Sequence, residues 1–136
     1  MRWLVAWYGI YQAGHVVLNA VYVFGDSPPP FPGPPGGWNE QAISFLDAIA
    51  TADLINAVAA LVFVGAWFRG RPWAAAVGAA TLTVSIYASI VFTAAAVTSG
   101  AWRAETAFGY VAIWVLFVPV LVLAVRLIPG LRLSRS

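Results

Sequence analysis

Residues 73–98 read WAAAVGAATLTVSIYASIVFTAAAVT and contain no Asp, Glu, Lys or Arg. An α-helix that crosses a bilayer needs about 20 consecutive, mostly apolar residues. The run is rich in Ala and lacks the sustained alternation of polar and apolar residues that marks a half-buried strand. The stretch therefore predicts one membrane-spanning helix.

The whole chain shares this apolar character. Its 136 residues are 62% hydrophobic and only 9% charged, whereas a soluble domain has about 45–50% apolar and about 25% charged residues. So few charges cannot coat a globule, which excludes a free cytosolic monomer. The absence of Cys excludes disulfides, thiolate nucleophiles and cysteine metal sites. The arginines are dispersed and form no basic stripe, so no nucleic-acid partner is expected.

Further apolar runs flank this first one. On either side of it, we expect helices at about 41–68 and 105–128, and a further helix at about 2–24. The helix at 105–128 is expected to stop at Pro129-Gly130. The loop 25–40 contains DSPPPFPGPPGG at 26–37, which predicts an extended, polyproline-like segment. The expected fold class is all-α: a polytopic membrane protein whose residues 1–136 form a single membrane domain, a bundle of four transmembrane helices.

The placement of arginines predicts the orientation. The segments expected on one side of the membrane hold Arg2, Arg69, Arg71, Arg126, Arg132 and Arg135, whereas the other side holds Arg103 alone. By the positive-inside rule, both termini then face the cytoplasm. The chain is expected to be an integral, multi-pass membrane protein whose Pro-rich loop faces outward or into an organelle lumen.

The first apolar segment carries a polar stripe. Its members recur every three or four residues and therefore share one helix face: Tyr8, Gln12, His15, Asn19, Tyr22 and Asp26. Such a face must meet other helices or a cavity. Interhelical hydrogen bonds that hold a bundle together and a functional site both explain it.

Asp53 is the acidic residue that a bilayer tolerates least. It lies about 10 residues inside its segment, hence about 15 Å deep at about 1.5 Å per residue, which is half of a core of about 30 Å. An unpaired carboxylate there costs a few kcal/mol or more. We therefore expect Asp53 to be protonated or paired with a donor from a neighbouring helix. The same count places His15 level with it, together with Tyr87, Ser89 and Trp114, and Tyr110 one turn further out.

Asp53 and His15 are the candidate catalytic residues, because an acid and an imidazole at one depth can exchange protons. The candidate ligand-binding residues are Asn19, Gln12, Asn56, Tyr87, Tyr110, Trp114 and Asp47. Asp47 is expected near the outer membrane interface. There it can either contribute to ligand binding or be an ordinary solvated surface residue, and the sequence favours neither. No metal is expected, since His15 is the one His of the sequence and hard cations need several oxygen ligands. No cofactor motif is present.

Several short motifs occur in a characteristic order. His15-Val16-Val17-Leu18-Asn19 precedes Tyr22-Val23, and Ala52-Asp53-Leu54-Ile55 follows. Next come Phe68-Arg69-Gly70-Arg71-Pro72-Trp73, Val84-Ser85-Ile86-Tyr87, and Ile113-Trp114 through Pro119-Val120-Leu121-Val122-Leu123. Their order and spacing resemble the EXPERA family, the four-helix fold of the emopamil-binding protein, a sterol double-bond isomerase, and of the sigma-2 receptor. Asn19 and Ser89 stand where that family's motifs have acids.

The resemblance implies an internal apolar cavity, open to lipid, that takes a flat apolar molecule with a polar head. The function hypothesis is an intramembrane isomerase or cyclase acting on a sterol or isoprenoid lipid by protonation and carbocation chemistry. Asp53 and His15 would move the protons, and Trp114 and Tyr110 would face the cation.

Two alternatives remain open at this point. The first is a non-catalytic receptor, carrier or stability factor of the same fold that binds sterols or other lipids. The second is a structural subunit of a membrane complex. A membrane lipid is the expected partner, and transport by such a short chain would need a homo-oligomer such as a homodimer.

The orientation can be tested in the cysteine-free chain by placing one cysteine at a time. Ser136→Cys is expected to be protected from an impermeant thiol reagent added outside intact cells or sealed organelles, and Gly33→Cys to be labelled. The reverse pattern would overturn the orientation.

Overall fold

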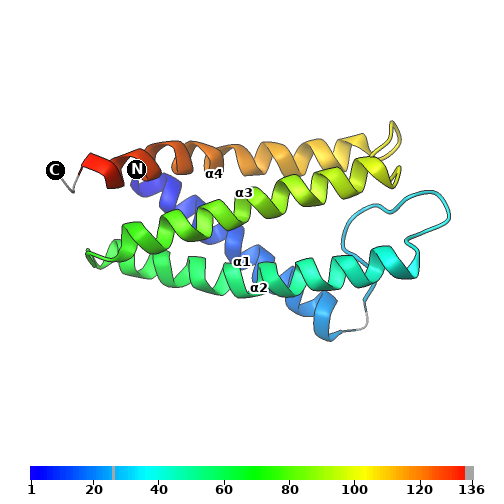
Figure 1. Ribbon diagram of the computed structural model, residues 1–136, viewed down its shortest axis with the longest axis horizontal. Helices are drawn as coiled ribbons and strands as arrows, with labels where there is room; N and C mark the ends of the chain where they lie inside the picture. The colour runs from blue at the N-terminus through cyan, green and yellow to red at the C-terminus, as the bar shows by residue number, and fades with distance from the viewer. Residues whose placement is uncertain (26, 134–136) are drawn as a thin grey trace.

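The computed structural model describes residues 1–25 and 27–133 (Figure 1). Over these residues the chain forms four helices and no strand: α1 at Arg2–Phe24, α2 at Glu40–Phe68, α3 at Ala74–Thr98 and α4 at Ala107–Leu133. The expected all-α class is therefore confirmed, with helix starts within two residues of those predicted. Asp26 of the polar stripe and Arg135 lie outside the described residues.

The lengths and hydropathy of three helices, α2, α3 and α4, fit a membrane. Among the described residues, three segments are long and apolar enough to cross a bilayer, namely Glu40–Phe68, Ala74–Thr98 and Ala107–Pro129. Helix α1 has 23 residues, enough for a span. Its mean hydropathy is lower, because Gln12, His15 and Asn19 interrupt the apolar run. The three apolar helices are compatible with a multi-pass integral membrane protein.

The link between α2 and α3 is a tight turn that ends α2. Gly70 has a φ of +65°, in the left-handed region that favours glycine. The backbone N–H of Gly70 donates to the Trp67 carbonyl at 3.0 Å, and that of Arg71 to the Ala66 carbonyl at 3.0 Å. These two bonds form a Schellman motif, which satisfies the last carbonyls of α2 and reverses the chain.

The predicted stop of the last helix at Pro129 is wrong, because α4 continues to Leu133 with Pro119 and Pro129 both inside it. A proline lacks the N–H that would bond to the carbonyl four residues earlier, so each one removes a single backbone hydrogen bond. Membrane helices tolerate such losses where neighbouring groups are at hand. Near Pro119, the indole N–H of Trp7 donates to the Leu116 carbonyl at 3.0 Å and ties α1 to α4.

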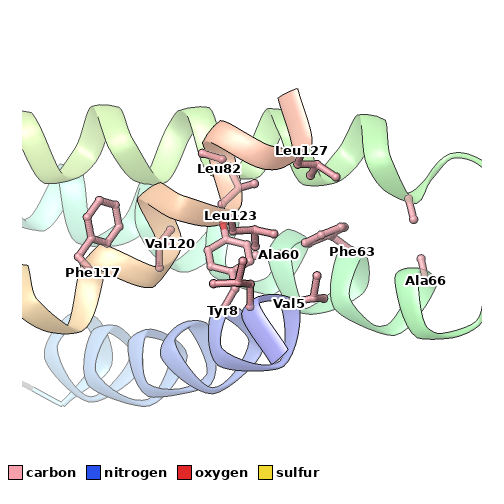
Figure 2. Packing of buried hydrophobic residues seen from close by; sticks show 13 residues of the cluster. Val5, Tyr8, Ala60, Phe63, Ala66, Leu82, Phe117, Val120, Leu123 and Leu127 are labelled. Atoms are coloured by element: carbon pink, nitrogen blue, oxygen red, sulfur yellow. The ribbon is translucent and has the colours of Figure 1, made fainter. Parts of the chain in front are cut away.

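The helices form a ring in which α1 packs on α2 and α4, and α3 packs on α2 and α4. The start of α1 lies at the same end of the bundle as the last turns of α4, and the loop after α1 lies at the opposite end (Figure 1). The main apolar core fills the end that holds the start of α1 (Figure 2). It includes Val5, Tyr8, Ala60, Phe63, Leu82, Phe117, Val120 and Leu123. The half nearer the Pro-rich loop contains smaller apolar clusters, around Leu46 and around Tyr110.

Candidate functional site

A pocket of about 460 Å³ lies between this core and the Pro-rich loop. All four helices line it, and Pro30 and Phe31 of the loop contribute to its wall. The lining is mostly apolar, with a few polar side chains gathered from α1, α2 and α3. Its volume falls within the range of about 300–1,000 Å³ that is usual for small-molecule sites.

The polar centre of the pocket is a hydrogen-bonded acid–imidazole pair between α1 and α2. His15 Nδ1 lies 2.5 Å from Asp53 Oδ2, and Asn19 Nδ2 donates to the same oxygen at 2.8 Å. His15 and Asn19 are four residues apart, so both side chains leave the same face of α1. The Asp53 side chain is only 12% exposed. The partner that a carboxylate at this position requires is therefore supplied by α1.

The pair leaves one reactive atom on each partner. Among the described residues, neither Nε2 of His15 nor Oδ1 of Asp53 has a hydrogen-bond partner. The ring of Tyr11 lies against the imidazole, with centroids 4.5 Å apart. The carboxylate and the tyrosine thus fix the orientation of the imidazole, and both members of the pair line the pocket.

A second polar cluster, centred on Ser85 of α3, joins three helices. The Ser85 Oγ accepts from Gln12 Nε2 at 2.9 Å and from Asn56 Nδ2 at 3.0 Å, and lies 3.0 Å from the Tyr8 hydroxyl. A serine hydroxyl has two acceptor positions and one donor. Because the two amides occupy the acceptor positions, the Ser85 O–H donates to Tyr8. The hydrogen-bonding capacity of this hydroxyl is then fully used.

Aromatic side chains of α4 form another part of the pocket wall. Trp114 donates its indole N–H to Thr93 Oγ1 at 3.1 Å, and its ring meets Phe117 edge-on. Tyr110 is buried and donates to the Pro32 carbonyl at 2.6 Å. Arg103 Nη1 also donates to the loop, to the Gly33 carbonyl at 2.8 Å. This part of the wall therefore brings aromatic rings to the pocket lining and holds the loop at its end.

Six of the predicted site residues line this pocket: Gln12, His15, Asn19, Asp53, Tyr110 and Trp114. Asn56 does not line it, since its side chain is buried behind Ser85. Asp47 is exposed and outside the pocket, which fits the solvated role that was the alternative. Over the described residues, no group of three or more His, Cys, Asp or Glu side chains could hold a metal ion.

The prediction that Tyr87 lines the site is wrong, because its side chain is 69% exposed and lies outside the pocket. Equal depth does not imply the same face. Tyr87 lies two residues from Ser85 and from Ser89, which is about 200° around a helix with 3.6 residues per turn. Ser85 and Ser89 face the pocket, so Tyr87 points away from it.

Sequence reasoning missed Ser85 as a site residue. The signal that could have found it is the spacing of Thr81, Ser85 and Ser89, which puts three hydroxyls on one face of α3. Thr81 and Ser85 are both buried. A polar stripe on α3 thus faces the polar stripe on α1.

A scan against protein-family models, a search of curated proteins and a search of solved structures each found no match for this chain. The fold and the site together define a small helical protein, compatible with several membrane spans, with one acid–imidazole pair in an apolar pocket.

Ser85→Ala is expected to lower the free energy of unfolding by about 1–3 kcal/mol, because it leaves buried polar atoms of Tyr8, Gln12 and Asn56 without their partner. The control is Ser89→Ala, one turn along the same helix. The Ser89 hydroxyl bonds only to the Ser85 carbonyl, so its loss should change stability by less than about 0.5 kcal/mol. Unfolding in mixed micelles measures both variants, and equal effects would contradict the role of Ser85.

Proposed function

We propose that the chain is an intramembrane isomerase or cyclase that acts on a sterol or isoprenoid lipid through protonation and carbocation chemistry. The observation that carries this proposal is the His15–Asp53 pair on the wall of a largely apolar pocket. A soluble substrate would not need such a lining, and a purely structural ion pair would not need a pocket beside it.

The proposal places the pocket inside the membrane. Helix α1 then provides the fourth span, its polar face turned to the pocket and its apolar face to lipid. The pocket serves as the internal apolar cavity, and both termini face the cytoplasm. The motif resemblance to the EXPERA family supports this arrangement.

The chemistry requires one proton to be added to a carbon of a C=C bond and another to be removed from a different carbon. His15 and Asp53 hold a proton between Nδ1 and Oδ2, and each has a second atom without a partner among the described residues. One of these atoms, Nε2 or Oδ1, can deliver a proton while the other accepts one. The number of protons on the pair is then the same before and after an isomerisation.

The carbocation between the two steps needs stabilisation without a nucleophile that would trap it. Trp114 and Phe92 are partly buried and line the pocket, and the π-system of an aromatic ring attracts a cation placed over its face. Trp114 is held in place by its bond to Thr93. The Tyr110 hydroxyl donates to the Pro32 carbonyl, and the Tyr110 ring is buried against Trp102, so this residue supports the wall and holds the loop.

A second candidate is a non-catalytic lipid-binding protein, such as a receptor, carrier or stability factor. Asn19 is the observation that favours it. Asn19 is an amide that donates a hydrogen bond to Asp53 Oδ2, the same oxygen that His15 contacts. Because residue 19 is not an acid, Asp53 is the carboxylate of this polar centre. One carboxylate that is already paired suits binding as well as proton transfer.

Asp53→Asn separates the two candidates. The amide keeps the size of the side chain but removes the transferable proton, so product formation from a panel of sterols and polyprenols should fall by about 10²-fold or more. Lipid affinity, measured on the same samples, should change far less. A binding protein would show no product in either form and a weaker affinity in the variant.

The matched control for this test is Asp47→Asn, the same substitution on the same helix at an exposed position outside the pocket. It should leave both product formation and affinity at wild-type values. Unchanged product formation in Asp53→Asn would eliminate the catalytic assignment.

A further inference from the structure

Gln12 has an acceptor that the protein itself leaves without a partner. Its side chain is 1% exposed, its Nε2 donates to Ser85, and its Oε1 is buried with no hydrogen-bond partner among the described residues. Gln12 also lines the pocket. A buried carbonyl oxygen without a donor is costly, so native proteins rarely keep one unless a ligand or water satisfies it.

The other polar groups of the pocket wall make the missing partner more specific. The donors of Trp7, Tyr110, Trp114, Ser89 and Thr93 are all engaged by protein acceptors. By contrast, the described residues supply no donor to Gln12 Oε1 or to Asp53 Oδ1. Gln12 Oε1 and Asp53 Oδ1 are thus acceptors that a donor on a ligand can satisfy.

The groups around Gln12 suit an uncharged donor. Among the described residues, Asp53 is the acid that lines the pocket, and its Oδ2 is already engaged by His15 and Asn19. An ammonium group beside the neutral amide of Gln12 would be desolvated without compensation. A hydroxyl group donates one hydrogen bond and carries no charge.

We propose that Gln12 selects the polar group of the ligand by accepting a hydrogen bond from its hydroxyl, so that the pocket takes a lipid alcohol in preference to the corresponding ether. This inference rests on the proposed function, since it assumes that a lipid occupies the pocket. Gln12 lies three residues before His15, about 4.5 Å along α1. The hydroxyl is therefore held one helical turn from the proton-transfer pair and is not itself the reacting group.

The first test compares two matched pairs of probes on the detergent-solubilised full chain: cholesterol with cholesteryl methyl ether, and geranylgeraniol with its methyl ether. Each ether keeps the apolar body and the oxygen but has no proton to donate. Quenching of tryptophan fluorescence reports binding, because Trp7 and Trp114 line the pocket. In at least one pair, the alcohol should bind about tenfold more tightly than its ether.

The second test assigns the preference to Gln12. Gln12→Leu should reduce the alcohol-to-ether affinity ratio to nearly one, mainly by weakening binding of the alcohol. Asn56→Leu is the matched control, since it removes the other amide that donates to Ser85 yet lies outside the pocket. It should cost similar stability and keep the ratio of the wild type.

The outcomes distinguish the two proposals. If the wild type binds the alcohols and the ethers equally, lipid binding stands and the hydroxyl site is wrong; a water molecule then satisfies Oε1. If Gln12→Leu keeps the ratio of the wild type, the assignment to Gln12 is overturned. If none of the four probes binds, the lipid function and the hydroxyl site both fail.

Discussion

The polar face of α1 must find its partners on other helices, and these partners determine how the bundle is arranged. Gln12 bonds to Ser85 of α3, while His15 and Asn19 both bond to Asp53 of α2. In a bilayer no water would replace a lost partner, so these bonds fix the rotation of α1 and its position along the bundle. The apolar core alone would leave both less well defined.

This constraint divides the bundle into two halves. At the start of α1, the side chains of Val5, Tyr8, Phe63 and Leu123 fill the space between the helices (Figure 2). Further along, polar and aromatic side chains surround a pocket that the Pro-rich loop covers at its end. The packed half supplies rigidity, and the other half supplies a lined space. A site built on such a rigid scaffold can hold its groups in a fixed geometry.

The sequence was sufficient to predict the helices, because long apolar runs and the Gly70 stop are local signals. Counting depth from one face also brought His15 level with Asp53, and the structure pairs them. Depth alone gave a wrong prediction for Tyr87, because residues at the same depth can point in different directions around the helix axis. The role of Ser85 could not be predicted from one chain segment, because it depends on three helices meeting at one hydroxyl. The helix was predicted to stop at Pro129 because proline usually ends a helix. That rule considers the proline alone and does not include the neighbouring groups that allow α4 to continue.

The proposed function requires that a lipid occupies the pocket beside His15 and Asp53. Gly14 lines this pocket, and a Cβ placed there would meet no atom within 4 Å. A bulky side chain at this position can thus fill the ligand space without disturbing the core. Mass spectrometry of lipids retained by the purified wild type and by Gly14→Trp measures the claim directly. We predict a specific lipid in stoichiometric amount on the wild type and its loss from the variant, at unchanged helical content. Equal lipid content in both proteins would contradict the account.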